Sequence, residues 1–209
     1  MGTDHYFTAE PASVADLRER SVRLAGRDLM VVTAGGVFSP DGVDRGTEAL
    51  LKDAPAPPDT GVFLDLGCGW GPMALTLALR SPAATVHAVD VNRRALDLVR
   101  RNAERLGCDV VAATPQGVPA DVKFDLIWSN PPIRVGKAVL HELLQAWLPR
   151  LAPGGQAFLV VQKNLGADSL QAWLTDALPG MDVSRASTSR GFRVLHVTRP
   201  DRPQARLPD

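Results

Sequence analysis

An asparagine, two prolines and an isoleucine, Asn130–Ile133, follow an apolar run that ends at Ser129. A residue before proline is pushed to extended backbone, and neither proline carries an N–H group. The turn is therefore predicted to offer two acceptors, the Asn130 side-chain oxygen and the Pro131 carbonyl, without competing backbone donors. Two fixed acceptors suit an –NH2 group with a delocalised lone pair, because accepting both N–H bonds aims that lone pair at an electrophile. The bland interpretation is a proline-rich turn that only ends a strand.

A second candidate site is the loop LDLGCGWGP, which follows another apolar run and opens a helical pattern. Gly67, Gly69 and Gly71 have the spacing G-x-G-x-G, which fits neither the dinucleotide fingerprint G-x-G-x-x-G nor a phosphate loop. Glycines at these positions permit positive φ and close backbone approach. Asp65, just before them, can hold loop amides or a cationic ligand group. Without a ligand, the same glycines would form only a tight strand–helix turn.

An acidic residue, Asp90, ends the next strand pattern, 19 residues beyond Gly71, and Val91 follows it. An acidic side chain at this place typically binds the hydroxyls of a ribose. The combination describes a nucleoside ligand without a pyrophosphate. S-adenosylmethionine fits, since it has a ribose, an adenine and an amino-acid tail with an ammonium group. With a sulfonium methyl near the acceptor turn, the predicted chemistry is methyl transfer to an amine.

These residues need a sheet that brings them together. Apolar runs at 62–66, 85–90, 109–114, 124–129, 156–162 and 192–198 alternate with helical patterns at 71–80, 92–107, 138–151 and 167–178. The alternation predicts βαβ units and a mostly parallel α/β sheet. Because such sheets bind ligands at the carboxyl ends of their strands, the Asp65–Gly71 loop, Asp90 and Asn130 should meet at one edge. Asn92 and Gly107 are predicted to cap the 92–107 helix.

The chain before this alternation has a different pattern. Apolar residues flank a polar turn at Gly26–Asp28, which predicts a hairpin, and VDRGTEALLKD predicts a short helix before the proline-rich stretch 53–61. We expect residues 1–60 to form an N-terminal extension that packs on a catalytic domain at 61–199. The polar, proline-rich residues 200–209 are expected to form a flexible tail.

Composition narrows the class of protein. The 209 residues are 45% hydrophobic, with 23 Lys and Arg against 23 Asp and Glu, so the chain is no dedicated polyanion coat. Its two cysteines form no disulfide framework, and its His and Cys residues show no metal-ligand spacing, so no metal is predicted. The N-terminus does not resemble a signal peptide and no apolar run approaches membrane-spanning length. We therefore expect a cytoplasmic protein that does not enter a membrane.

Taken together, the motifs LDLGCGWGP, AVDVNRRAL, FDLIWSNPPIRVGK and GFRVLHV resemble the class I S-adenosylmethionine-dependent methyltransferases. HYF at 5–7 and GVFSPDGVDRGTEALL at 36–51 resemble more closely the small-domain family of ribosomal RNA guanine-N2 methyltransferases that modify small-subunit RNA. The resemblance extends from about His5 to Val197. It implies a Rossmann-like fold, with a mostly parallel seven-stranded sheet, helices on both faces and a short N-terminal extension of a β-hairpin and a helix.

The resemblance also implies roles for individual residues. Gln116 stands where the family often has an acidic residue near the adenine amine, and Val37–Thr47, with Phe38, would pack over the cofactor or the substrate. Apart from the resemblance, Arg134 and Lys137 directly follow the amine turn, where they are expected to hold phosphates beside a flipped base; the alternative is two solvated cations at a helix start. The target amine would be bound by Asn130, Pro131, Pro132 and Ile133. The cofactor would be bound by Asp65, Gly67, Gly69, Gly71, Asp90, Val91, Gln116 and Asn130.

The predicted activity is methyl transfer to guanine N2 in small-subunit ribosomal RNA, with that RNA or the small subunit as partner. One alternative is a methyltransferase for another amine, in adenine, protein glutamine or a small molecule. Ile133 favours guanine over glutamine, since glutamine methylation more often goes with an aromatic residue there. Another alternative is a non-catalytic RNA-binding module in ribosome assembly. Larger members of the family carry a second domain before the catalytic one, whereas residues 1–60 alone precede the predicted catalytic domain of this sequence. The RNA would then be recognised by this lead segment, by an oligomer or by the surface of the catalytic domain.

Overall fold

The computed structural model describes residues 17–189 and 191–201, apart from the side chain of Arg134. Its main sheet has seven strands in the order β5-β4-β3-β6-β7-β9-β8. Strands β3 to β7 pair in parallel, and β9 runs antiparallel to both β7 and β8. The strands are β3 (Val62–Leu66), β4 (Thr85–Val89), β5 (Val111–Ala113), β6 (Phe124–Ser129), β7 (Leu151–Gln162), β8 (Asp182–Ser189) and β9 (Phe192–Thr198).

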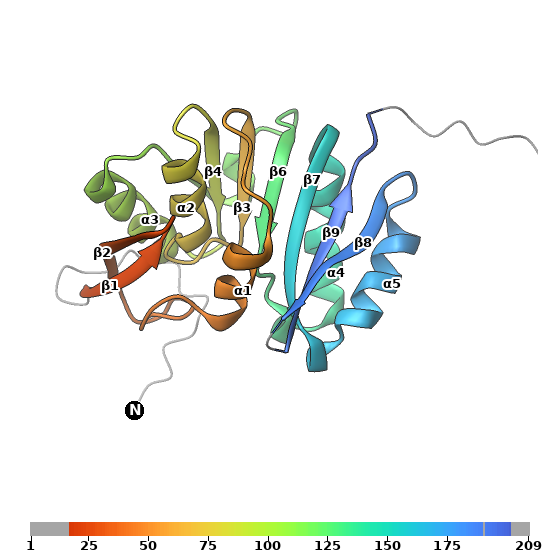
Figure 1. Cartoon of the computed structure of the whole chain (residues 1–209), viewed down its shortest axis with the longest axis horizontal. Coiled ribbons are helices and arrows are strands. Elements are labelled where there is room, and N and C mark those ends of the chain that lie inside the picture. Colours follow the sequence, from red (N-terminus) through yellow and green to blue (C-terminus); the bar gives the residue numbers. More distant parts are fainter. Residues whose placement is uncertain (1–16, 190, 202–209) are drawn as a thin grey trace, which may run out of the picture.

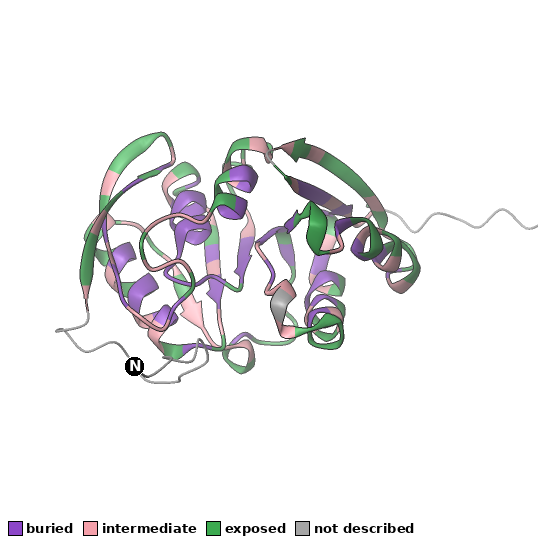
Figure 2. Ribbon diagram, turned by 90° about the horizontal axis from the view of Figure 1, so that it is seen from below, coloured by how far each residue is buried: buried purple, intermediate pink, exposed green. Residues whose placement is uncertain are grey.

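Helices cover both faces of this sheet (Figure 1). Side chains of a strand alternate between faces, so Phe63 packs on one face and Leu64 on the other. The Phe63 face is covered by α1 (Arg45–Asp53), α2 (Pro72–Arg80) and α3 (Arg93–Leu106). The Leu64 face is covered by α4 (Lys137–Trp147) and α5 (Ala167–Ala177). Figure 2 shows buried residues along the central strands and on the helix sides that face them. The predicted mostly parallel, seven-stranded Rossmann-like fold is confirmed.

The predicted hairpin is formed by β1 (Arg18–Leu24) and β2 (Arg27–Thr33), which pair antiparallel. Its turn is Ala25–Gly26, with φ of 50° and 78°, so the predicted turn residues Arg27 and Asp28 belong to β2 instead. Two successive positive φ values match the turn to the right-handed twist of the strands. The apolar side of the hairpin packs on α2 and α3.

Two elements differ from the prediction. The helix predicted at 138–151 ends at Trp147, and Leu148–Arg150 form a 3₁₀ turn before β7 begins at Leu151. Pro149 has no N–H to continue the helix, which explains the early end. Strand β8, DVSRASTS, is not apparent in the sequence because it is an edge strand in which small polar residues replace a buried apolar run. The predicted caps are confirmed, since Asn92 accepts from the Arg94 N–H and Gly107 ends α3 with φ of 65°.

The predictions of no membrane span and of a C-terminal tail have separate outcomes. No helix among the described residues is long and apolar enough to cross a membrane. Residues 202–209 of the predicted tail lie outside the described residues.

Candidate active site

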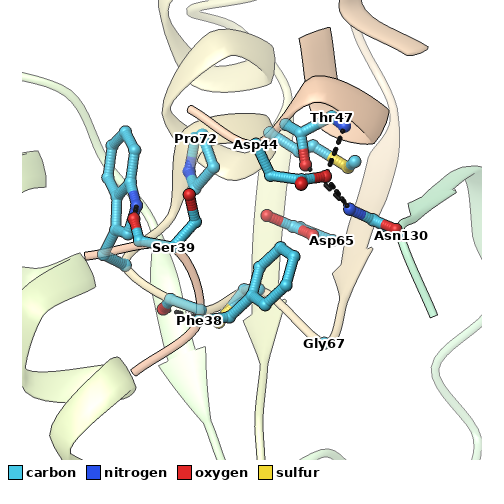
Figure 3. Close-up of a pocket in the computed structure, with 12 residues that line it drawn as sticks. Phe38, Ser39, Asp44, Thr47, Asp65, Gly67, Pro72 and Asn130 are labelled. Carbon is cyan, nitrogen blue, oxygen red and sulfur yellow. Dashed lines mark hydrogen bonds between the residues drawn. The ribbon is translucent and has the colours of Figure 1, made fainter. Parts of the chain in front are cut away.

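A pocket lies at the carboxyl ends of β3 and β6, beneath the segment that leads into α1 (Figure 3). It brings together the predicted site residues Phe38, Asp65, Gly67, Gly69 and Asn130. The other predicted site residues do not line it: Gly71, Asp90, Val91, Gln116, Pro131, Pro132, Ile133 and Lys137.

The glycine loop is shaped by positive φ angles. Gly67 has φ of 77°, and a Cβ built on it would meet no protein atom within 4 Å, so its open side faces the pocket. Its N–H donates to Val89 O at 2.8 Å, which fixes the loop against the end of β4. Gly71 also has a positive φ, of 98°, but a Cβ there would lie 3.0 Å from Val99 Cγ2. Gly71 therefore serves the packing of α2 on α3.

Asp65 is buried at the end of β3, with 1% of its surface exposed. Its Oδ2 accepts a hydrogen bond from the Ala74 N–H in the first turn of α2, at 2.8 Å. Burial raises the pKa of Asp65 to about 7, although the Ala74 bond acts in the opposite direction and the nearby Asp90 adds to the rise. A carboxyl group with such a pKa ionises readily when a cation enters the pocket.

Asp90 holds the loop from the side of β4. Its Oδ2 accepts from the Gly69 N–H and its Oδ1 from the Asn92 N–H, both at 2.9 Å. Burial raises the pKa of Asp90, and these backbone hydrogen bonds lower it. Val91, beside it, is exposed, and so is Gln116, which lies in the 3₁₀ turn η2 (Pro115–Gly117) after β5. Val91 and Gln116 thus lie on the surface after the carboxyl ends of β4 and β5, which pair in parallel.

The segment 34–44 is tied down over the glycine loop. The Asn92 amide donates to Gly36 O at 2.7 Å, and Trp70 Nε1 donates to Ser39 O at 3.1 Å. Thr33 Oγ1 donates to Pro40 O at 2.6 Å. Ser39 has φ of 49°, an uncommon conformation for a residue other than glycine. These bonds from α3, the loop and β2 make the lead segment one wall of the pocket.

Asn130 lies across the pocket from Phe38 and Ser39 and beside Asp44, at the end of the same segment (Figure 3). Its Nδ2 donates to Asp44 Oδ2 at 2.8 Å and to Thr47 Oγ1 at 3.2 Å (Figure 3). Pro131 O accepts from the Ile133 N–H at 2.9 Å, so the prediction that no backbone donor competes for this carbonyl was wrong. The closed turn at Pro132 brings that N–H back to the carbonyl. A carbonyl oxygen has two lone pairs, so Pro131 O keeps one acceptor site.

Ile133 lies in the 3₁₀ turn η3 (Ile133–Val135), outside the pocket that Asn130 lines. It borders a separate groove of about 230 Å³ between α4 and α5, together with Lys137 and His141. His141 stacks on Trp173 with ring centroids 3.7 Å apart. The side chain of Arg134 and the HYF motif at 5–7 lie outside the described residues.

Asp44 and Thr47 are pocket residues for which the sequence analysis gave no individual role. Asp44 caps α1, since its Oδ2 accepts from the Gly46 and Thr47 N–H groups at 2.8 and 3.2 Å. Aspartate directly before a helical pattern is a readable N-cap signal. The contact with Asn130, 86 residues away, leaves no local signal.

The chain is similar in sequence to known methyltransferases. The family model described as "Methyltransferase small domain" matches residues 28–196. Over 197 residues the chain is 32% identical to the uncharacterized protein YbxB of Bacillus subtilis (strain 168), covering 92% of this chain and 97% of that protein. It is 37% identical to ribosomal RNA small subunit methyltransferase C of Pseudomonas aeruginosa (strain LESB58), over 75% of this chain and 48% of that protein.

The solved T. thermophilus 16S rRNA N2 methyltransferase RsmC, in complex with AdoMet and guanosine, superimposes with a TM-score of 0.73 at 26% identity. The match covers 90% of this chain and 52% of that one. The chain thus spans about half the length of the methyltransferase C relatives that it matches. The resemblance predicted from the motifs is confirmed, and the chain belongs to the methyltransferase small domain family.

Proposed function

We propose that this protein transfers a methyl group from S-adenosylmethionine to the N2 amine of a guanine in small-subunit ribosomal RNA. The observation that carries the proposal is one pocket lined by both the glycine loop and Asn130. The strands before them are parallel neighbours, with Leu66 paired to Ser129. Relatives named as small-subunit ribosomal RNA methyltransferases, and a structural neighbour solved with AdoMet and guanosine, support the same reading.

The glycine loop and the ends of β4 and β5 would hold the cofactor. The open side of Gly67 leaves room for it, and the Asp65 carboxylate suits the ammonium of its amino-acid tail. Each oxygen of Asp90 accepts one backbone N–H, so further lone pairs can accept from ribose hydroxyls. Val91 and Gln116 would border the adenine. Gly69 would lie against the cofactor, whereas Gly71 would act through the shape of the loop.

The asparagine turn would hold the acceptor. When bound, the cofactor supplies a methyl group on a positively charged sulfur. The Asn130 oxygen and the second lone pair of Pro131 O would accept the two N–H bonds of guanine N2, which aims its lone pair at the methyl carbon. The N–C bond forms as the S–C bond breaks, the electron pair goes to sulfur, and a proton then leaves N2 for solvent. Positioning and electrostatics supply the rate.

Side chains beyond the pocket would bind the rest of the RNA. Lys137 is exposed at the start of α4 and borders the groove beside Ile133, where a cation can reach the phosphates of a nucleotide flipped into the site. We assign the same role to Arg134. Ile133 would pack on the flipped base, and Phe38, which is 39% exposed, would cover it from the opposite wall.

The lead segment is part of this proposal. We propose that residues 1–60 act as an extension of a catalytic domain at 61–199, with 200–209 as a tail. The support is the packing of the hairpin on α2 and α3, together with the bonds that hold 34–44 over the loop. With ribosomal RNA or the small subunit as partner, the protein would act in the cytoplasm.

The test is transfer of tritium from labelled S-adenosylmethionine to unmodified small ribosomal subunits. Naked ribosomal RNA, free protein and a reaction without acceptor run alongside, followed by nucleoside analysis. We expect label in N2-methylguanosine, and the better acceptor of the two shows whether the target is recognised in free RNA or in the subunit. Label in another nucleoside or in protein would show that the target amine belongs to that molecule and not to guanine. No label in any acceptor, with cofactor binding intact by calorimetry, would refute the proposal.

A further inference from the structure

The carboxylate of Asp44 faces the amide of Asn130, the proposed acceptor residue. A single oxygen of Asp44, Oδ2, accepts three hydrogen bonds, from the N–H groups of Gly46 and Thr47 and from Asn130 Nδ2. Thr47 Oγ1 accepts a second bond from the same Nδ2. Figure 3 shows both partners on one side of the Asn130 amide and its oxygen on the other.

We propose that Asp44 is a positioning residue, which locks the Asn130 amide so that its oxygen faces the substrate amine. An amide can flip, since its oxygen and nitrogen have nearly the same shape. An ionised carboxylate only accepts, so it bonds the flipped state poorly, in which the Asn130 oxygen would face Asp44. The inference rests on the proposed function only in naming that amine as the ligand of the oxygen.

The space around Gly46 supports this arrangement independently. Gly46 is buried in the first turn of α1, and its φ is not in the left-handed region. A Cβ there would lie 2.9 Å from Asp44 Oδ2, 3.2 Å from Phe192 Cε1 and 3.3 Å from Asn130 Nδ2. Alanine normally stabilises a helix relative to glycine, so backbone conformation does not explain this residue. Its missing side chain gives the carboxylate and the amide room to meet.

Asp44 also caps α1, so its structural role must be separated from its positioning role. Asp44→Asn keeps a carbonyl oxygen able to accept all three bonds. Asp44→Ser keeps an N-cap oxygen on a shorter side chain, which can bond the helix amides but cannot reach Asn130. Gly46→Ala keeps Asp44 and crowds its contact with Asn130. Asp41 is in the same segment but does not line the pocket, and it pairs with Arg20 on the surface, so Asp41→Asn is the matched control.

The first readout is methyl transfer, with melting temperature and cofactor dissociation constant measured for every variant. We expect Asp44→Ser and Gly46→Ala to lower turnover about 10- to 100-fold, with cofactor affinity within about twofold of wild type. Asp44→Asn should retain turnover within about fivefold, and Asp41→Asn should match wild type. Wild-type turnover in folded Asp44→Ser and Gly46→Ala would overturn the proposal. If Asp44→Ser melts early, Gly46→Ala alone decides, since it leaves the cap in place.

The second readout needs no acceptor and separates this inference from the proposed function. In ¹⁵N-labelled protein, the Asn130 side-chain NH2 signals should exchange slowly with solvent in wild type and Asp41→Asn, and quickly in Asp44→Ser. Equally fast exchange in wild type and Asp44→Ser would overturn the positioning role. Protected signals in a protein that methylates no acceptor would instead refute the proposed function, while the Asp44–Asn130 lock would stand.

Discussion

The glycine-loop half of the pocket (Asp65–Gly69 with Asp90) is held by backbone amides, whereas the asparagine half (Asn130 with Asp44 and Thr47) is held by side chains. Asp90 bonds the Gly69 and Asn92 N–H groups, and all these residues lie within one strand–helix–strand stretch and the turn after it. Asn130 instead bonds Asp44, 86 residues earlier in the chain. The first half can form with its βαβ unit, but the second needs α1 docked on β7 and β9, where Asp44 reaches the residue that follows β6. Substitutions in the glycine-loop half should therefore change cofactor affinity, and substitutions in the asparagine half should change turnover.

The largest effect is expected in the asparagine half. Asn130→Ala should lower turnover about 100- to 1000-fold, because it removes the side chain that we propose as an acceptor for the reacting amine. Cofactor affinity should stay within about twofold, since the glycine loop is untouched. Single-turnover methyl transfer and calorimetry measure the two quantities. Gln145→Ala, which removes an exposed amide on α4, is the control. Equal losses in turnover and cofactor affinity would contradict the division into two halves.

An effect of similar size is expected in the glycine-loop half, on the pH dependence of stability. Burial raises the pKa of Asp65 to about 7 from an ordinary 3.8, so between these values the folded protein keeps a proton that the unfolded chain releases. The free energy of unfolding should therefore fall as pH rises from about 4 to 7, by on the order of 4 kcal/mol from this group. In Asp65→Asn this component disappears.

Urea unfolding of both proteins at several pH values checks the Asp65 prediction. The free energy of unfolding of Asp65→Asn should gain on that of wild type as pH rises through this window. Parallel curves would show that Asp65 does not carry the dependence. Cofactor affinity of wild type should rise over the same range as the carboxylate forms, and that of Asp65→Asn should not.

A smaller effect is expected at Asp90. Asp90→Ala removes the acceptor for the Gly69 and Asn92 N–H groups and the proposed ribose contact, so the cofactor dissociation constant should rise about 10- to 100-fold. Asp97→Ala, which removes a carboxylate paired with Arg101 on the surface of α3, serves as control. Calorimetric titration measures both. Unchanged affinity in Asp90→Ala would remove the ribose assignment.

The smallest effect is expected at Gly67, where a comparison with Gly107 separates the cost of left-handed backbone from the loss of space in the pocket. Gly67 and Gly107 have φ of 77° and 65°, and a Cβ at either would meet no protein atom within 4 Å. Alanine at either position should lower the free energy of unfolding by about 1 kcal/mol, because both adopt left-handed backbone. Only Gly67→Ala should also raise the cofactor dissociation constant, about 3- to 10-fold, since its methyl group enters the pocket. The same affinity in both variants would mean that Gly67 only shapes the loop.

Much of the fold was predictable because its signals are local. Strand–helix alternation from Val62 onward, the Asn92 cap and the Gly107 stop are written in short stretches, and the structure has them. Three local signals were misread, since the hairpin turns at Ala25–Gly26, Pro149 ends α4 early and β8 lacks the apolar pattern of a buried strand. An edge strand needs no such pattern, because one neighbour and one covered face suffice to hold it.

The candidate site was predictable only in part. Asp65, Gly67, Gly69 and Asn130 were predicted at one sheet edge from parallel-strand topology, and they line one pocket. The segment over the glycine loop was not predictable in detail, because Trp70 bonds Ser39 O and Asn92 bonds Gly36 O between segments that are distant in the sequence. Nor was the Ile133 N–H bond to Pro131 O, which depends on the turn angle at Pro132.

By itself the sequence determined the family, the sheet and the chemical groups at its carboxyl edge, because periodicity and motif spacing act over a few residues. The tertiary structure alone decided that the nitrogen of the Asn130 amide, and not its oxygen, faces Asp44 and Thr47. That choice depends on a carboxylate and a hydroxyl brought from α1, and on the absence of a side chain at Gly46. An amide has no preferred orientation of its own, so only its neighbours in space can set one.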